Sequence, residues 1–237
     1  MSELLLKIDN LSTSYGRIPM LMDVSLEFHE SSVCCVLGAN GAGKSTLVKA
    51  ILGMVKADTG KVIFSGEDIT SLPTHKRIEQ GIQVASAASG SFAKMNVETN
   101  LRLGAYNLKD PKVMAERLEE IYESFPVLKA RLAQKAGTLS GGERTMLAIA
   151  RAVINKPHLL IMDEPSLGLA PIVVDEVFRI VRRLNEQEGM SIMLVEQNVK
   201  KALGVSHFGY VIQKGQIIFS GDSSELEKSS IAENAVM

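Results

Sequence analysis

The chain has 237 residues, of which 46% are apolar and 22% charged, and its net charge is -1. This length suits one large domain or two small ones, and the composition is that of an ordinary globular protein. The balanced charge gives no indication of a dedicated nucleic-acid surface. The first residues lack the basic start and long apolar stretch of a secretory signal. No apolar run approaches the roughly 20 residues that span a bilayer, so we expect any work at a membrane to involve another subunit.

The first part of the chain is rich in patterns that predict β-strands. The predicted strands are Leu4–Ile8, Met22–Phe28, Val33–Leu37 and Lys61–Phe64, with turns at Gly16-Arg17 and at Asp58-Thr59-Gly60. The wholly apolar run Val33–Leu37 predicts a buried strand. It contains both cysteines, Cys34 and Cys35. Neighbouring strand residues point to opposite faces, so we expect two small apolar side chains and no vicinal disulfide.

Helical periodicity dominates from residue 89 to residue 155, and the β pattern then returns. The predicted elements after it are the strand Leu159–Met162, the helix Pro171–Glu186, the strand Ser191–Val195 and a hairpin around Lys214-Gly215. We therefore predict one α/β domain over residues 1–237. Its core is formed by residues 1–88 and 156–237, and a helical subdomain over residues 89–155 is inserted in it.

The segment Gly38–Thr46 fits the phosphate-loop pattern G-x-x-x-x-G-K-[ST], between a predicted strand and a predicted helix. Glycines let backbone N–H groups close around phosphate oxygens, and the following helix directs its positive end at the same anion. In this chemistry Lys44 bridges the β- and γ-phosphates and the Ser45 hydroxyl ligates Mg²⁺. A glycine-rich turn with a chance Lys-Ser is the alternative, and the strand–loop–helix context disfavours it.

Two acids, Asp163 and Glu164, close the predicted strand Leu159–Met162. Ligands of parallel α/β sheets bind at the carboxyl ends of the strands. We therefore assign Asp163 to Mg²⁺ and Glu164 as the general base that activates water. A solvated strand end is the alternative when these two acids are considered alone.

A second glycine motif, Leu139-Ser140-Gly141-Gly142-Glu143, opens a predicted helix. Ser140 is a good N-cap, so an ordinary capping turn is one interpretation. Exposed N–H groups at a helix start also form an anion site. One nucleotide does not need two such sites in one chain, so we infer that Ser140, Gly141, Gly142 and Glu143 serve the γ-phosphate of a nucleotide on another subunit.

These motifs make the chain resemble the ATP-binding subunit of an ABC transporter over nearly its whole length. The resemblance implies a P-loop NTPase (RecA-like) fold with a mixed-sheet core, an N-terminal antiparallel β part and an inserted helical subdomain. It implies ATP and Mg²⁺ as ligands and places Tyr15 against the adenine. From spacing alone, a strand tyrosine that has no role in nucleotide binding explains Tyr15 nearly as well. The ATP-binding residues that it implies are Tyr15, Gly38, Asn40, Gly41, Ala42, Gly43, Lys44, Ser45 and Thr46.

A narrower resemblance is to the branched-chain amino-acid importer ATPases, in particular the smaller subunit of the pair. Its carriers are Glu164–Pro171, Leu194–Asn198 and the motif that ends in Glu143, where most ABC proteins have Gln. Gln197 stands where others have the switch histidine, and Ala170 where others have an Asp. The resemblance thus adds Gln197 to Lys44 and Glu164 as catalytic residues. Related urea and amide importers share much of this pattern.

One position fits neither level of the resemblance. The family places a Val-Pro-Gln or Val-Pro-Glu turn where this chain has Ala85-Ser86-Ala87. Ala87 cannot ligate a metal, which predicts a weaker Mg²⁺ site, slower hydrolysis and poorer coupling unless Ser86 or backbone groups compensate. A non-hydrolysing regulatory subunit is therefore a rival interpretation, which Lys44 and Glu164 oppose.

The resemblance also implies partners: membrane permeases, an extracytoplasmic solute-binding protein and a facing ATPase subunit, either a copy of this chain or, as we favour, a related one. The expected location is the cytoplasmic side of the membrane, as a peripheral subunit. A soluble ABC ATPase acting on DNA or ribosomes is disfavoured, since the chain has no second cassette, long coiled coil or basic extension. A small-molecule kinase would leave Leu139–Glu143 without a role.

Overall fold

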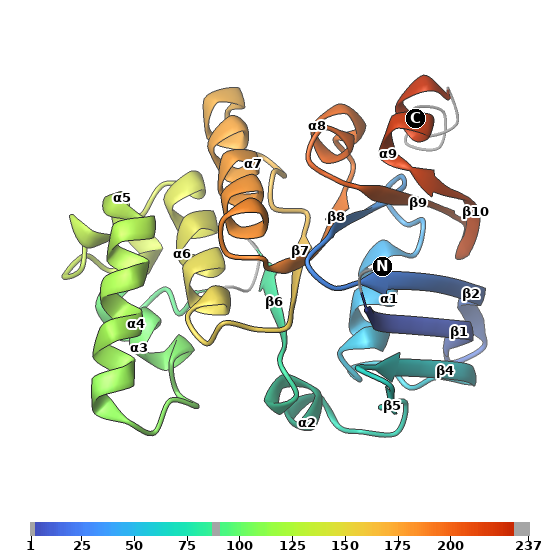
Figure 1. The fold of residues 1–237 in the computed structure, drawn as a ribbon, viewed down its shortest axis with the longest axis horizontal. Helices are drawn as coiled ribbons and strands as arrows, with labels where there is room; N and C mark the ends of the chain where they lie inside the picture. Colours follow the sequence, from blue (N-terminus) through green and yellow to red (C-terminus); the bar gives the residue numbers. More distant parts are fainter. Residues whose placement is uncertain (1–2, 87–90, 230–237) are drawn as a thin grey trace.

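A computed structural model describes residues 3–86 and 91–229. The described residues form two sheets with helices packed against them (Figure 1). Ala87, and the predicted boundary between residues 88 and 89, lie outside the described residues. The division into core and helical subdomain therefore remains a prediction.

Four strands form an antiparallel sheet in the order β2-β1-β4-β5. Their bounds are Leu4–Tyr15 for β1, Ile18–His29 for β2, Thr59–Phe64 for β4 and Glu67–Asp68 for β5. The turn at Gly16-Arg17 is confirmed. The predicted turn at Asp58-Thr59-Gly60 is wrong in its last two residues, which begin β4. Gly60 has φ +83°, and a Cβ there would lie 2.3 Å from the carbonyl oxygen of Asn10, so this glycine serves a close approach of two strands.

Six strands form the central sheet in the order β10-β9-β3-β8-β7-β6. Their bounds are Ile82–Ser86 for β6, Val33–Leu37 for β3, Leu159–Asp163 for β7, Ser191–Glu196 for β8, Phe208–Gln213 for β9 and Gln216–Asp222 for β10. Only β9 and β10 pair antiparallel within this sheet, as the predicted hairpin requires. The parallel pairing of β3, β6, β7 and β8 brings their carboxyl ends to one edge. The mixed-sheet α/β fold is thereby confirmed.

The strand β3 contributes to two cores at once. Cys34 and Val36 pack with the antiparallel sheet and the helix α1 (Lys44–Ile51). Val33, Cys35 and Leu37 pack on the opposite face. Both cysteines are buried and free, and burial raises the pKa of Cys35 to about 12.

Apart from the short α2 (Thr74–Glu79), the remaining helices occupy two places around the sheet (Figure 1). Three cover the face to which Cys35 points: α7 (Pro171–Glu186), α8 (Val199–Leu203) and α9 (Ser223–Lys228). The helix α2 precedes β6. A lateral group, at the left of Figure 1, contains α3 (Val97–Gly104), α4 (Pro111–Ser124), α5 (Pro126–Lys129), a 3-10 turn (Ala136–Thr138) and α6 (Gly141–Val153).

Arg77 of α2 joins this helix to the end of α1. Its side chain is 2% exposed, and burial lowers the pKa of its guanidinium. The guanidinium donates to four carbonyl oxygens, of Ala50 (2.8 Å), Ile51 (2.8 Å), Thr70 (2.7 Å) and Leu72 (2.9 Å). Two of these close the carboxyl end of α1, the helix that follows the predicted phosphate loop.

We expect Arg77→Met to lower the free energy of unfolding by about 3 kcal/mol, because buried carbonyls lose a charged donor. Urea denaturation measures this loss. Arg102→Met is the matched control: Arg102 is half exposed and pairs with Glu98 on the surface, so its loss should cost no more than about 0.5 kcal/mol. Equal effects of the two substitutions would contradict this role of Arg77.

Candidate functional site

The loop between β3 and α1 has a backbone that only glycine tolerates at several positions. Gly41 and Gly43 have φ of +78° and +113°. A Cβ on Gly38 would lie 2.4 Å from the carbonyl oxygen of Ile212. These glycines therefore fix the loop shape that the sequence pattern predicts for phosphate binding.

Lys44, the first residue of α1, is the buried cation of this loop. Its side chain is 3% exposed. The Nζ donates to the carbonyl oxygens of Gly38 (2.8 Å) and Ala39 (3.0 Å) and lies 3.2 Å from Oε1 of Glu164. Lys44 thus connects the glycine loop with the acid that follows β7.

The last residue of β7, Asp163, and the residue after it, Glu164, are acids in different surroundings. Glu164 has a left-handed φ of +49°, and its N–H donates to the carbonyl oxygen of Val195 (2.9 Å). Oδ1 of Asp163 is buried and has no hydrogen-bond partner within the described residues. Burial raises the pKa of Asp163, the charge of Glu164 raises it further, and Lys44 offsets part of this.

Gln197 links the loop to Glu164, and the sheet order explains how. It follows β8, which lies between β3 and β7. Its Nε2 donates to Oδ1 of Asn40 (2.7 Å) and to Oε1 of Glu164 (2.8 Å). The residues predicted as catalytic, Lys44, Glu164 and Gln197, are therefore brought together from three strands. Ser45, Asp163 and Glu164 line a hollow of about 430 Å³, together with Ser86 and Gly141.

The start of α6 has the predicted N-cap, which is confirmed. The Ser140 hydroxyl accepts from the Glu143 N–H (3.3 Å), and a Glu143 carboxylate oxygen accepts from the Ser140 N–H (2.8 Å). Glu143 also pairs with Arg131 at 2.7 Å. A Cβ on Gly142 would lie 2.4 Å from Val173 Cγ1, so this glycine lets α6 approach α7 closely.

The other predicted binding residues differ in how far they are exposed. Ser45 is exposed, whereas Ala42 and Thr46 are buried, so the last two offer mainly backbone groups to a ligand. Tyr15 ends β1 and is 45% exposed. The sequence analysis named Ser86 only as a group that could compensate for Ala87, and it gave Glu196 no role. A lone acid at a strand end gives no signal before its contacts are known.

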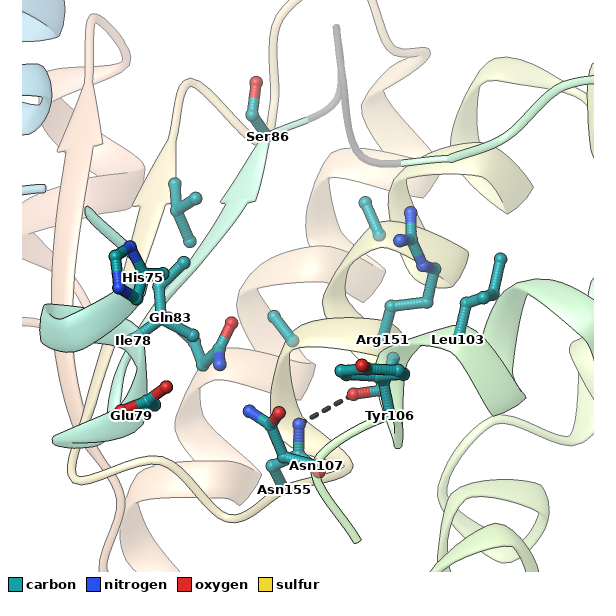
Figure 2. Close-up of a pocket in the computed structure, with 14 residues that line it drawn as sticks. His75, Ile78, Glu79, Gln83, Ser86, Leu103, Tyr106, Asn107, Arg151 and Asn155 are labelled. Atoms are coloured by element: carbon teal, nitrogen blue, oxygen red, sulfur yellow. Dashed lines mark hydrogen bonds between the residues drawn. The ribbon is translucent and has the colours of Figure 1, made fainter. Parts of the chain in front are cut away.

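A second hollow, of about 440 Å³, separates α2 and β6 from α3 and α6 (Figure 2). His75 and Gln83 line one side, and Leu103, Tyr106 and Arg151 the other. Tyr106 is 81% exposed and Leu103 38%. The hollow thus combines the exposed side chains of Leu103 and Tyr106 with polar side chains such as those of Gln83 and Arg151.

Comparison with known proteins identifies the family to which the chain belongs. The family model described as ABC transporter matches residues 21–167, which is more than half of the chain, and the chain belongs to this family. It is 40% identical to the high-affinity branched-chain amino acid transport ATP-binding protein BraG of Pseudomonas aeruginosa, over 94% of both chains. It is 38% identical to the probable branched-chain amino acid transport ATP-binding protein LivF of Archaeoglobus fulgidus, again over 94% of both.

A solved ATP-binding cassette of an ABC transporter, in its ADP conformation, matches with a TM-score of 0.87 and 29% identity. The match covers 98% of this chain and 96% of that one. The chain is therefore a nucleotide-binding cassette of the ABC ATPase type. Within the described residues, no helix combines the length and apolar content needed to cross a bilayer.

We expect Glu143→Gln to make the stability of α6 less dependent on pH. The backbone hydrogen bond from Ser140 is the main cause that lowers the pKa of Glu143; burial opposes it, and the Ser140 side chain and the charge of Arg131 lower the pKa further. A lowered pKa stabilises the fold above the ordinary value of 4.5, and this contribution is lost as pH falls through the lowered value. At pH 7 the substitution should cost about 1 kcal/mol.

At strongly acidic pH the two proteins should have the same unfolding free energy, which chemical denaturation at several pH values measures. Glu119→Gln is the control, because Glu119 is exposed and its ion pair with Lys129 is long at 3.4 Å. A stability difference that stays constant across the pH range would contradict the role of the Glu143 charge.

Proposed function

We propose that this chain is the ATP-hydrolysing subunit of a membrane importer for branched-chain or other amino acids. The observation that carries the proposal is the contact of Lys44 and Gln197 with Glu164, which joins a phosphate loop to a base. The relatives named for branched-chain amino-acid transport, similar over 94% of their length, support the solute class. Urea or amide import remains the alternative solute class.

Residues 38–46 fit the phosphates of ATP. The glycine backbone and the start of α1 provide N–H donors, and Lys44 provides a charge at the loop. Tyr15 would stack on the adenine with its exposed ring. A nucleotide phosphate would compete with the carbonyl oxygens of Gly38 and Ala39 for the Lys44 ammonium.

The donor set near β7 fits Mg²⁺. Asp163 has a buried carboxylate oxygen without a partner in the described part of the chain, and the Ser45 hydroxyl lines the same hollow. Hard cations prefer such oxygen ligands, and a bound Mg²⁺ would neutralise charge that builds up on the phosphates.

Hydrolysis requires a base and a second subunit. Glu164 would accept the proton of the attacking water. The amide of Gln197, which donates to the Glu164 carboxylate, would hold this base in place. Ser140, Gly141 and Gly142 of a facing ATPase subunit would close over the γ-phosphate, because Ser140 is exposed at the start of α6 and the N–H groups of the first helical turn follow it. Most of the rate enhancement would come from positioning and charge stabilisation.

The permease would dock in the hollow between α2, β6, α3 and α6 (Figure 2). A partner in this hollow contacts both parts of the fold, so closure around ATP would move it. The exposed apolar rim, Leu103 and Tyr106, suits a segment of permease helix. In this assembly the chain is peripheral on the cytoplasmic side, and an extracytoplasmic solute-binding protein delivers the amino acid.

We expect Glu164→Gln to slow ATP hydrolysis by about a hundredfold or more, because the water loses its base. Sustained ATP should then trap a dimer, visible by size-exclusion chromatography with light scattering. Adding Ser140→Arg should abolish the trapped dimer, since the arginine obstructs the facing nucleotide site. If wild type and Glu164→Gln dimerise identically under sustained ATP, the rival regulatory interpretation holds.

Tyr106→Asp should lower solute-stimulated ATP hydrolysis of the reconstituted transporter by about tenfold, because it puts a charge into an apolar docking rim. Hydrolysis by the isolated subunits should stay unchanged. Glu227→Ala is the control, because α9 lies far from α2 and α3 in Figure 1 and does not line the hollow. Equal solute-stimulated hydrolysis by wild type, Tyr106→Asp and Glu227→Ala would refute docking in this hollow.

A further inference from the structure

Glu196 is a buried acid that the proposed mechanism does not use. It ends β8, and its side chain is 2% exposed. No basic side chain of the described residues lies within 4.0 Å of it as an ion-pair partner, whereas Lys44 serves Glu164. A buried carboxylate without a cation is costly unless backbone donors satisfy it, so its presence needs a physical reason.

Three backbone N–H groups satisfy this carboxylate, and they come from two separate segments. Oε1 accepts from the N–H of Ser166 (2.9 Å), in the turn after β7. Oε2 accepts from the N–H of Gln197 (3.1 Å) and of Asn198 (3.3 Å), directly after β8. One carboxylate therefore holds together the two segments that provide Glu164 and Gln197.

The position of Glu164 depends on this connection. Its φ of +49° is unfavourable for a non-glycine residue, so the surrounding structure must hold it. The N–H of Glu164 is tied to Val195 on β8, and two residues later Ser166 is tied to Glu196 on the same strand. Without the second tie, the turn at Glu164 has one fewer attachment to β8.

We propose that Glu196 is a positioning residue for ATP hydrolysis: its carboxylate clamps the turn at residues 164–166 to the end of β8 and so holds Glu164 and Gln197 in register. It contacts neither nucleotide nor water and acts through these two side chains. The inference rests on the proposed function, because it assigns the clamp to the same reaction.

The clamp predicts that removing Glu196 lowers kcat and leaves the dissociation constant for ATP nearly unchanged. In Glu196→Ala the turn loses its acceptor, and we expect kcat to fall at least about tenfold, since small misplacement of a catalytic group costs up to about a hundredfold. The dissociation constant for ATP should stay within about twofold, because the glycine loop and Lys44 remain intact. Glu196→Gln keeps one acceptor oxygen but turns an amide toward N–H donors, so its kcat should be intermediate.

Asn185→Ala is the matched control for a structural loss. Asn185 is also buried, at 7% exposure, and its amide donates to the carbonyl oxygens of Ser31 (3.0 Å) and Met190 (2.8 Å), near the opposite end of β8. It should lower the melting temperature and leave kcat per folded molecule unchanged.

Hydrogen exchange of the peptide that covers residues 164–170 tests the clamp without relying on hydrolysis. Exchange should be faster in Glu196→Ala than in wild type and unchanged in Asn185→Ala. Faster exchange with a lower kcat and an unchanged ATP affinity supports the proposal. Unchanged exchange, an unchanged kcat, or an ATP affinity lost in parallel with kcat overturns it.

If Glu196→Ala does not fold, Glu196→Gln decides: a kcat and exchange rate equal to wild type overturn the proposal, and a kcat below wild type with faster exchange supports it. A wild-type protein that never hydrolyses ATP, alone or with its partners, instead refutes the proposed function, while the exchange data still test the clamp.

Discussion

The contact between Lys44 and Glu164 is the interaction on which the candidate site depends. These residues follow β3 and β7, which are not neighbours in the sheet, since β8 lies between them. A buried lysine and a nearby acid stabilise each other's charges where water is scarce. The sheet order therefore determines which loops can share these charges, and Gln197, at the end of the intervening strand, reaches both sides.

The arrangement around this ion pair is held by the backbone as much as by side chains. Glycines at the phosphate loop allow φ values and contacts that other residues would prevent. The turn after β7 is fixed through N–H groups, to Val195 and to Glu196. A site built in this way suits phosphoryl transfer, in which the protein mainly positions groups and stabilises charge.

Local patterns sufficed for part of this structure. The buried strand before Gly38 and the N-cap Ser140 could be predicted because each depends on residues close in sequence, whereas the mixed sheet was implied by the family resemblance. The full lengths of β1 and β2 could not, because polar residues in both are held by pairing across the sheet. Arg77 and Glu196 also escaped prediction, since their partners lie on segments distant in sequence.

The alternation of β3 side chains between two buried faces has a further consequence for the two thiols. Cys34 faces the core shared with the antiparallel sheet, and Cys35 faces the core shared with α7, α8 and α9. Each sulfur thus marks the integrity of a different half of the molecule. Alkylation of one but not the other would distinguish partial opening of one layer from complete loss of the fold, which a single spectroscopic signal would merge.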